Sequence, residues 1–360
     1  MRIIFIVPSL KSGGLERVAS MLSNEWSHQK GVDVVLITLD SKPPFYSLDS
    51  NVHLIQADVR IDTGYPIIKF LKKWIWLRKE VKRMEADVLL TFGERYNAFV
   101  IYALRHLNIP IFVGNRTSPE TSLKGFRGKI NPKAYRFAKA VFLQTHRSHE
   151  MLTFRYSGVN FEVIPNPIEA TSATIDYSSK IILNVGSFTG KKNQIALVRI
   201  FADLVKVYPY WQLVFAGEGP KLAGVKQEVN NLGIGGSVQF VGLVKEMASF
   251  HEQGSIFAFT SLLEGFPNAL AEAMRSGLSV IAMDCITGPS ELIANGENGF
   301  LIEEGNNHEY KQYLGALMGD ESLRRSMGQQ AQSDTSNLDV SIIAPQYLSS
   351  FKRVLKEQIN

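Results

Sequence analysis

Two glutamates, Glu264 and Glu272, flank a Gly-Phe-Pro turn in the segment LLEGFPNALAEAMRSGLSVIA. Two acids at this spacing arise by chance in a chain of this length, so the residues between them carry the information. Pro267 has no backbone N–H and is favoured at a helix start, where the next amides lack partners. We expect such free amides at Asn268, Ala269 and Leu270. Because a helix start binds anions and carboxylates bind hydroxyls, the segment predicts a site for a nucleotide sugar.

A glycine pair lies in the loop PSLKSGGLERV, between the first apolar run and a helix-like stretch. Gly13 and Gly14 let the backbone approach a ligand closely, beside the N–H groups that open the helix. The loop does not match the GxGxxG pattern, which disfavours a dinucleotide cofactor. A plain turn accounts for this loop equally well.

The corresponding loop of the second half is NVGSFTGKKNQ. Gly186 permits close approach, and Lys191 and Lys192 bring positive charge to a helix start. The loop follows a strand, and α/β sheets bind ligands at the carboxyl ends of their strands. We therefore expect Lys192 to contact a phosphate, although paired lysines in a loop are often only solvated.

Two further turns admit two interpretations each. FAGEGP contains Gly217 and Gly219, which either admit a ligand or only form a strand-to-helix turn. VQFVGLV ends with Gly242 and Leu243, where exposed backbone either contacts a flat base or simply ends a strand.

Apolar, β-rich runs alternate with amphipathic stretches along the whole chain, from RIIFIV and VDVVLITL to SIFAFT and SVIAM. Strands separated by helices indicate parallel sheets that helices cover on both faces, and two such series indicate two doubly wound, Rossmann-like domains. A stretch rich in Pro, Ser and Thr, VIPNPIEATSATIDYSSK, marks the linker. We expect an α/β fold with domains at 1–170 and 171–338. A C-terminal helix at 339–360 follows, and the first domain is one choice for its packing partner.

Composition limits the class of protein. The chain has 360 residues, 45% of them hydrophobic, which is enough for two cores. Cys285 is the only cysteine, so an intrachain disulfide and a Cys-based zinc site are excluded, and a reducing cytosol fits. The N-terminal apolar run stops at Pro8, too early for a signal peptide or a membrane span. Residues 1–170 carry 24 Lys and Arg against 15 Asp and Glu, and the remainder carries 15 against 19, which indicates two domains with different partners.

Five elements, in order, resemble the retaining GT-B glycosyltransferases of glycosyltransferase family 4. They are SGGLERV, GSFTGKKN, EGFPNALAE, GPSEL and NGENGFLI. The resemblance covers nearly the whole chain, is strong in the second half and is moderate in the first. It implies a GT-B fold, in which two Rossmann-like domains face each other across a cleft. The domain at 1–170 would bind the acceptor and the domain at 171–338 the nucleotide sugar. It also implies transfer of a hexose or N-acetylhexosamine from a nucleotide sugar, with UDP preferred on family frequency.

The resemblance further implies a role for each matching residue. Lys192 binds the donor diphosphate, Glu272 holds the ribose hydroxyls and Glu264 contacts the transferred sugar. Gly14 lies against the diphosphate from the other domain, and Leu243 contacts the base. The amides that meet the sugar or phosphate are those of Asn268, Ala269 and Leu270.

Two positions depart from the family pattern. Ser187 stands where the family usually has Arg, which leaves Lys191 or Arg116 to share the diphosphate charge. A family His near the reacting sugar is absent from VGNRTSPE, where Arg116 stands instead, as in a subset of the family. Arg116 is therefore a candidate catalytic residue, with a structural ion pair as the alternative. We expect no metal cofactor, because the chain has no DxD and positive charge suffices to stabilise a departing diphosphate.

A basic stretch, IIKFLKKWIWLRKEVKRM, interleaves cations with tryptophans. This mixture is typical of helices that lie on anionic lipid, although a solvated helix with buried tryptophans is the alternative. We expect membrane contact through Lys69, Lys72, Lys73, Trp74 and Trp76. The acceptor would then be a lipid-linked or surface-polysaccharide saccharide, in O-antigen, capsule or lipopolysaccharide synthesis at the inner face of the cytoplasmic membrane.

Two other functions compete. A sugar-nucleotide epimerase shares the GT-B fold but lacks the GFPNALAE context. A nucleic-acid-binding protein would suit the pI of about 9.1, but the basic residues lie outside the glycine loops and the second half is acidic. We therefore expect a glycosyltransferase, with no nucleic acid among its partners.

Overall fold

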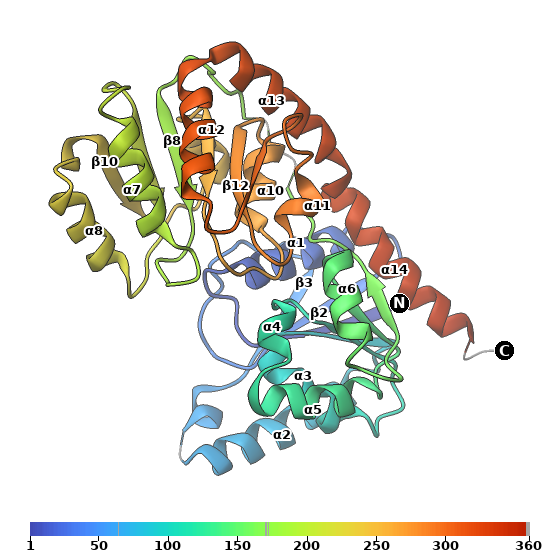
Figure 1. The fold of residues 1–360 in the computed structure, drawn as a ribbon. Coiled ribbons are helices and arrows are strands. Elements are labelled where there is room, and N and C mark those ends of the chain that lie inside the picture. Colours follow the sequence, from blue (N-terminus) through green and yellow to red (C-terminus); the bar gives the residue numbers. More distant parts are fainter. Residues whose placement is uncertain (64, 170, 172, 358–360) are drawn as a thin grey trace. The chain divides into compact units, whose positions relative to one another are not determined.

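The chain folds into two compact units, each built on its own parallel sheet (Figure 1). The computed structural model describes residues 1–63, 65–169, 171 and 173–357. The first unit comprises Met1–Pro167 and the C-terminal segment Leu338–Asn360, and the second comprises Ile168–Asn337. These divisions fall close to the expected boundaries.

Seven parallel strands form the sheet of the first unit, in the order β3-β2-β1-β4-β5-β6-β7. The order reverses between β1 (Arg2–Val7) and β4 (Val88–Phe92), and doubly wound sheets bind ligands at such a point. Both strands are nearly continuous apolar runs, because helices cover both faces of the sheet. The other strands are β2 (Asp33–Thr38), β3 (Val52–Gln56), β5 (Ile111–Gly114), β6 (Ala140–Leu143) and β7 (Phe161–Val163).

Two helical layers cover this sheet, and each encloses one apolar cluster. One cluster joins the sheet to the first and last helices, and the other joins it to the helices between β3 and β6. The elements are α1 (Gly14–Ser27), η1 (Val59–Asp62), α2 (Pro66–Arg83), α3 (Glu94–Leu104), α4 (Pro119–Ser122), α5 (Gly125–Tyr135), α6 (His146–Thr153) and α14 (Val340–Glu357).

The C-terminal helix α14 packs on the first unit. The indole of Trp26 donates a hydrogen bond to the carbonyl of Ala344 at 3.0 Å, and its ring meets those of Tyr347 and Phe351 at 5.8 and 6.0 Å. Apolar side chains on one side of α14 therefore complete the first core. Residues 358–360 of the expected helix lie outside the described residues.

Six parallel strands form the sheet of the second unit, in the order β10-β9-β8-β11-β12-β13. They are β8 (Ile181–Val185), β9 (Gln212–Ala216), β10 (Val238–Gly242), β11 (Ile256–Phe259), β12 (Ser279–Asp284) and β13 (Phe300–Glu303). The helical elements are α7 (Gln194–Leu204), α8 (Leu222–Asn231), η2 (Gly235–Ser237), α9 (Met247–His251), α10 (Asn268–Arg275), α11 (Pro289–Leu292), α12 (Asn307–Gly319), α13 (Glu321–Asp334) and η3 (Ser336–Leu338). Apolar clusters lie on both faces, so both units are doubly wound as predicted.

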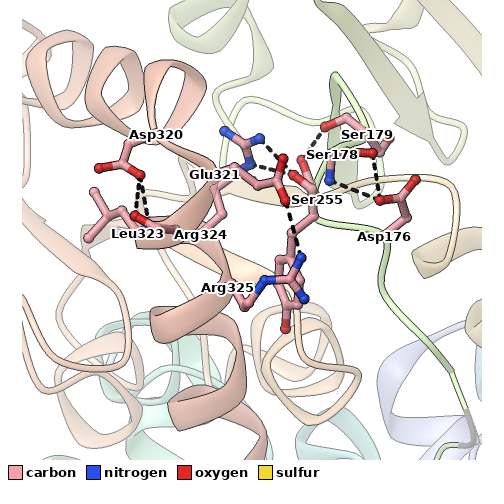
Figure 2. A network of polar contacts seen from close by, with 11 residues as sticks. Asp176, Ser178, Ser179, Ser255, Asp320, Glu321, Leu323, Arg324 and Arg325 are labelled. Carbon is pink, nitrogen blue, oxygen red and sulfur yellow. Dashed lines mark hydrogen bonds and ion pairs between the residues drawn. The ribbon is translucent and has the colours of Figure 1, made fainter.

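A network of polar contacts lies at the amino ends of the strands in this second sheet (Figure 2). Arg324 of α13 donates to the carbonyl of Tyr177 from Nε at 3.0 Å and Nη2 at 2.6 Å, and to that of Leu317 from Nη1 at 2.6 Å. The hydroxyl of Ser255 donates to the carbonyl of Ser179 at 2.6 Å. These two serines precede β11 and β8, so the network lies at the edge opposite the predicted ligand loops.

Candidate functional site

A lysine–glutamate pair lies at the carboxyl edge of the second sheet. Lys192 Nζ is 2.5 Å from Glu264 Oε1, and the two side chains are 22% and 12% exposed. The hydroxyl of Thr260, just after β11, donates to the carbonyls of Lys192 and Asn193 at 3.1 and 3.3 Å. Asn193 itself takes a left-handed conformation, with φ 52°, immediately before α7. The ends of the neighbouring strands β8 and β11 therefore hold the lysine in place.

Glycines make the backbone of this edge compact. A Cβ on Gly186 would lie 3.4 Å from the side chain of Lys192, so the lysine already lies along this turn. Gly217 has φ +135°, and a Cβ there would come within 2.1 Å of the Gly186 carbonyl oxygen. Glycine at position 217 thus has a packing reason, which favours the turn interpretation of FAGEGP. A ligand contact at Gly217 stays a prediction.

Residues that follow β12 contact the Gly-Phe-Pro turn, which precedes α10, and support it. Thr287 donates its hydroxyl hydrogen to the carbonyl of Glu264. Gly288 has φ +114°, and a Cβ there would overlap Pro267 at 2.2 Å. Burial and the charge of Glu264 raise the pKa of the Cys285 thiol to about 12, so this buried thiol stays protonated at neutral pH. The GPSEL element and the threonine before it thus pack against the turn that carries Glu264 and support it.

Helix α10 begins directly after Pro267, as predicted. The expectation of a free amide at Asn268 is wrong, because this N–H donates to the carbonyl of Phe266 at 3.0 Å. The amide of Ala271 donates to Pro267 at 3.0 Å and opens the helical ladder. The two remaining first-turn amides lie where an α-helix provides no acceptor. They belong to Ala269 and Leu270.

The remaining predicted contacts of the second unit surround this edge. Glu272 is half-buried in the second turn of α10. Ser187 and Lys191 are exposed, so Lys191 brings a second positive charge beside Lys192. Leu243 is 49% exposed directly after the edge strand β10, which suits contact with a flat ring. Across the described part of the chain, no group of three or more His, Cys, Asp or Glu side chains is arranged to hold a metal ion.

Gly13 and Gly14 belong to the first unit and form the start of α1. A Cβ on Gly13 would come within 2.4 Å of Glu16 Oε2, so the carboxylate of Glu16 lies over the glycine loop. Burial raises the pKa of Glu16, and the hydroxyl of Ser9 donates to it at 3.2 Å. Glu16 belongs to the SGGLERV element, although no role was predicted for it. Because the loop and the Lys192 site lie in different units, the predicted cleft stays a prediction.

Arg116 follows β5 in the first unit and has only neutral partners among the described residues. Its guanidinium donates to Tyr347 at 3.2 Å and to Asn166, and lies 4.3 Å from the ring centre of Phe92. Its buried Nε has no hydrogen-bond partner in the same described part of the chain. Burial lowers the pKa of Arg116. The described residues therefore give Arg116 no structural ion pair, and its contact with an anion stays a prediction.

Helix α2 carries the basic stretch, and its exposed apolar residues differ from those predicted. Trp74 and Trp76 are half-buried and pack against the core of the first unit, which favours the alternative of buried tryptophans, and their contact with a membrane stays a prediction. Lys72 is exposed, whereas Lys69 and Lys73 are intermediate. The large apolar side chains exposed on α2 and just before it are Tyr65, Ile67, Ile68, Phe70, Leu71 and Ile75. Within the described ranges, no helix is long and apolar enough to cross a bilayer.

Comparison with known proteins identifies the family. A model of "Glycosyltransferase Family 4" matches residues 12–172, and one of "Glycosyl transferases group 1" matches residues 168–334. The chain resembles crystal structures of TarM (TM-score 0.84, 13% identity, covering 97% of this chain and 98% of TarM) and of Anabaena HepE with UDP and glucose (TM-score 0.84, 17% identity, 98% and 100%). The fold and site thus define a GT-B glycosyltransferase.

Full-length relatives point the same way. The chain is 27% identical over 344 residues to an uncharacterised glycosyltransferase of Haemophilus influenzae, covering 93% of each protein. It is 25% identical over 368 residues to a Campylobacter jejuni α-1,4-N-acetyl-D-galactosaminyltransferase whose name gives an undecaprenol-diphosphate-linked acceptor, covering 98% and 99%. The protein belongs to the glycosyltransferases of family 4.

Proposed function

We propose that this glycosyltransferase moves a hexose or N-acetylhexosamine from a UDP-sugar to a lipid-linked or surface-polysaccharide acceptor, with retention of configuration and without a metal. The observation that carries the proposal is the Lys192–Glu264 pair beside the start of α10. The names of relatives support the acceptor class; one relative is an amylovoran biosynthesis glycosyltransferase of Erwinia amylovora. HepE was crystallised with UDP and with UDP-glucose, which supports the base.

The proposal divides the work among the residues at the carboxyl edge. Lys192 exchanges its bond to Glu264 for the donor diphosphate and stabilises the charge that develops on it. Glu264 then accepts hydrogen bonds from hydroxyls of the transferred sugar, and Glu272 accepts those of the ribose. Leu243 covers the base. The helix amides that meet the sugar or phosphate are those of Ala269 and Leu270.

The first unit supplies the remaining positive charge. Arg116 has no acidic partner among the described residues, so an incoming diphosphate is a suitable counter-charge. Together with the exposed Lys191 it replaces the arginine that the family usually has at Ser187. Gly13 and Gly14 leave room for the diphosphate from this side, once Glu16 turns away from the loop.

Helix α2 is proposed as the contact with the cytoplasmic face of the membrane. Its exposed apolar residues include Ile67, Leu71 and Ile75, and lysines lie between them. Cations attract anionic headgroups, while aliphatic side chains enter the acyl boundary. The protein should bind vesicles that contain phosphatidylglycerol, and high salt should release it. The double variant Ile67→Ser/Ile75→Ser should bind about thirtyfold more weakly, from roughly 1 kcal/mol of lost burial per side chain, or about 2 kcal/mol together. Val207→Ser, at an exposed position of the second unit, is the control; equal binding to neutral vesicles would contradict the proposal.

Thermal-shift measurements with UDP, GDP, ADP and duplex DNA test the donor class. A rise of Tm with UDP, and a smaller one with GDP and ADP, is the expected result. Persistence of the UDP shift in excess EDTA would agree with metal independence. A response to DNA alone would overturn the proposal. The relatives named above are transferases, and no contact among the described residues favours the epimerase.

A further inference from the structure

An unassigned cluster of buried polar groups lies in the first unit, at the switch point of its sheet. Glu94 is the first residue of α3 and follows β4, which neighbours β1. Gly93 before it has φ +108°, and a Cβ there would lie 2.5 Å from Pro8, at the end of β1. Only glycine fits this turn without strain, so the fold fixes where Glu94 begins its helix.

Glu94 is buried without an adequate partner. The residue is 4% exposed, and its Oε2 makes no hydrogen bond within the described residues. Oε1 accepts one long hydrogen bond, from the amide of Asn131 at 3.4 Å. Desolvation raises the pKa of Glu94, and the hydroxyls of Thr117 and Ser122, the charge of Arg127 and the amide of Asn131 act in the opposite direction with smaller effects. A carboxyl that only closed a helix start would be expected to bond the amides there.

Neighbouring side chains share this lack of partners. Asn131 Oδ1, Asn115 Nδ2 and Ser118 Oγ are buried polar atoms with no partner in the part of the chain that the structure describes. The hydroxyl of Ser122, which also lies beside Glu94, donates to Asn115 Oδ1 at 3.2 Å and connects these groups. Asn131 thus connects to Glu94 directly and Asn115 through Ser122, while Ser118 lies in the adjoining loop between Asn115 and Ser122. Together they present unused acceptors and one unused amide donor.

A satisfied buried amide in the same helix shows the contrast. Asn97 Oδ1 accepts from Thr91 at 3.3 Å, and its Nδ2 donates to the Gly114 carbonyl at 3.1 Å and to Tyr135 at 3.2 Å. Packing of α3 thus completes the hydrogen bonds of a structural side chain nearby. Packing gives the Glu94 carboxyl no such set of partners, so its Oε2 is available to a group from outside the chain.

We infer that the Glu94 cluster binds hydroxyl groups of a saccharide, and that this saccharide is the acceptor. Sugar hydroxyls both donate and accept, which matches a carboxyl, an amide oxygen and a hydroxyl beside an amide NH₂. The identity of the saccharide as acceptor rests on the proposed transferase function. Glu94 acts here as a binding residue for one acceptor hydroxyl, and it belongs to the first unit, whereas Lys192 and Glu264 belong to the second.

Saturation-transfer NMR on the full chain tests this site, with the methyl α-glycosides of glucose, galactose, N-acetylglucosamine and N-acetylgalactosamine as probes. At least one should bind, and E94Q should weaken it at least tenfold while UDP affinity stays within twofold. The control E120Q changes a glutamate paired with Lys124 at 3.8 Å and should leave glycoside binding unchanged.

A second variant covers the case in which E94Q folds poorly. S118A removes a hydroxyl that has no partner in the described chain, so it should keep the wild-type Tm and weaken the glycoside about threefold to tenfold. Binding of none of the four glycosides, or equal binding by wild type, E94Q and S118A, would overturn the inference. Glycoside binding without any UDP binding would instead leave this site standing and contradict the transferase proposal.

Discussion

The two edges of the second sheet differ in the partners of their charged side chains. At the amino edge, the guanidinium of Arg324 is 4% exposed and donates to backbone carbonyls of Tyr177 and Leu317. At the carboxyl edge, Lys192 and Glu264 are more exposed and, among the described residues, form their only ion pair with each other. Backbone acceptors cannot leave, whereas a partner side chain can be exchanged for a ligand. We therefore assign a structural role to the amino edge and the chemistry of transfer to the carboxyl edge.

Lys192→Ala should give the largest effect. Removing the charge that stabilises the departing diphosphate should lower kcat/KM by about a thousandfold, or roughly 4 kcal/mol of transition-state stabilisation. The Tm should change little, because a partly exposed ion pair contributes little to stability. Initial rates with a UDP-sugar, alongside thermal melts, measure both quantities. Lys191→Ala is the matched control with a smaller expected loss, and a Lys192→Ala rate within tenfold of wild type would break the comparison.

Arg324→Met should show the opposite behaviour. It leaves two buried carbonyls without their donor and should cost about 3 kcal/mol of unfolding free energy, measured by urea denaturation. Affinity of the folded protein for UDP should not change. The neighbouring Arg325→Met removes an exposed pair with Glu321 and a cation–π contact with the ring of Tyr177, and should cost below about 1 kcal/mol. Equal losses of unfolding free energy in the two variants would contradict the structural role of the amino edge.

Glu272→Ala should weaken UDP binding by about tenfold to a hundredfold, because a carboxylate that bonds ribose hydroxyls contributes roughly 1.5–3 kcal/mol. Titration calorimetry at constant salt measures this change. Glu304→Ala, at an exposed acid after β13, is the control and should bind UDP as wild type does. An unchanged dissociation constant for Glu272→Ala would refute its assignment to the ribose.

Local sequence patterns predicted the elements and much of the carboxyl edge. The glycine loops, Pro267 and the two lysines occupy strand-to-helix turns whose conformation neighbouring residues determine. Exposure was harder to predict, because it depends on contacts between distant segments. The tryptophans of α2 are half-buried against the core of the first unit, while aliphatic neighbours are exposed.

The groups that no pattern indicated are positioned entirely by tertiary structure. Thr287 reaches the carbonyl of Glu264 only once β11 and β12 pair. Glu94 reads in the sequence as an ordinary acid at a helix start, and only its burial reveals its unpaired oxygen. Arg116 likewise changes from a candidate ion pair to a charge with neutral neighbours.

A pH measurement extends the comparison to the first unit and should give the smallest effect. Burial raises the pKa of Glu94, so the folded state favours its neutral form. This carboxyl therefore lowers stability above its folded pKa, and the loss disappears as pH falls towards 4.5, its ordinary value. Glu94→Gln should be more stable than wild type at pH 8, with a smaller difference at pH 5. Urea melts at both values check this, and a constant difference would show that Glu94 does not titrate as stated.

The central claim is that the carboxyl edge of the second unit binds a nucleoside diphosphate through Lys192. Titration calorimetry of the wild-type chain and Lys192→Ala with UDP, both in EDTA, tests it most directly. The account predicts saturable binding to the wild type and at least a tenfold weaker dissociation constant for the variant. Binding of equal strength to the two proteins, or no binding of UDP to either, would contradict it.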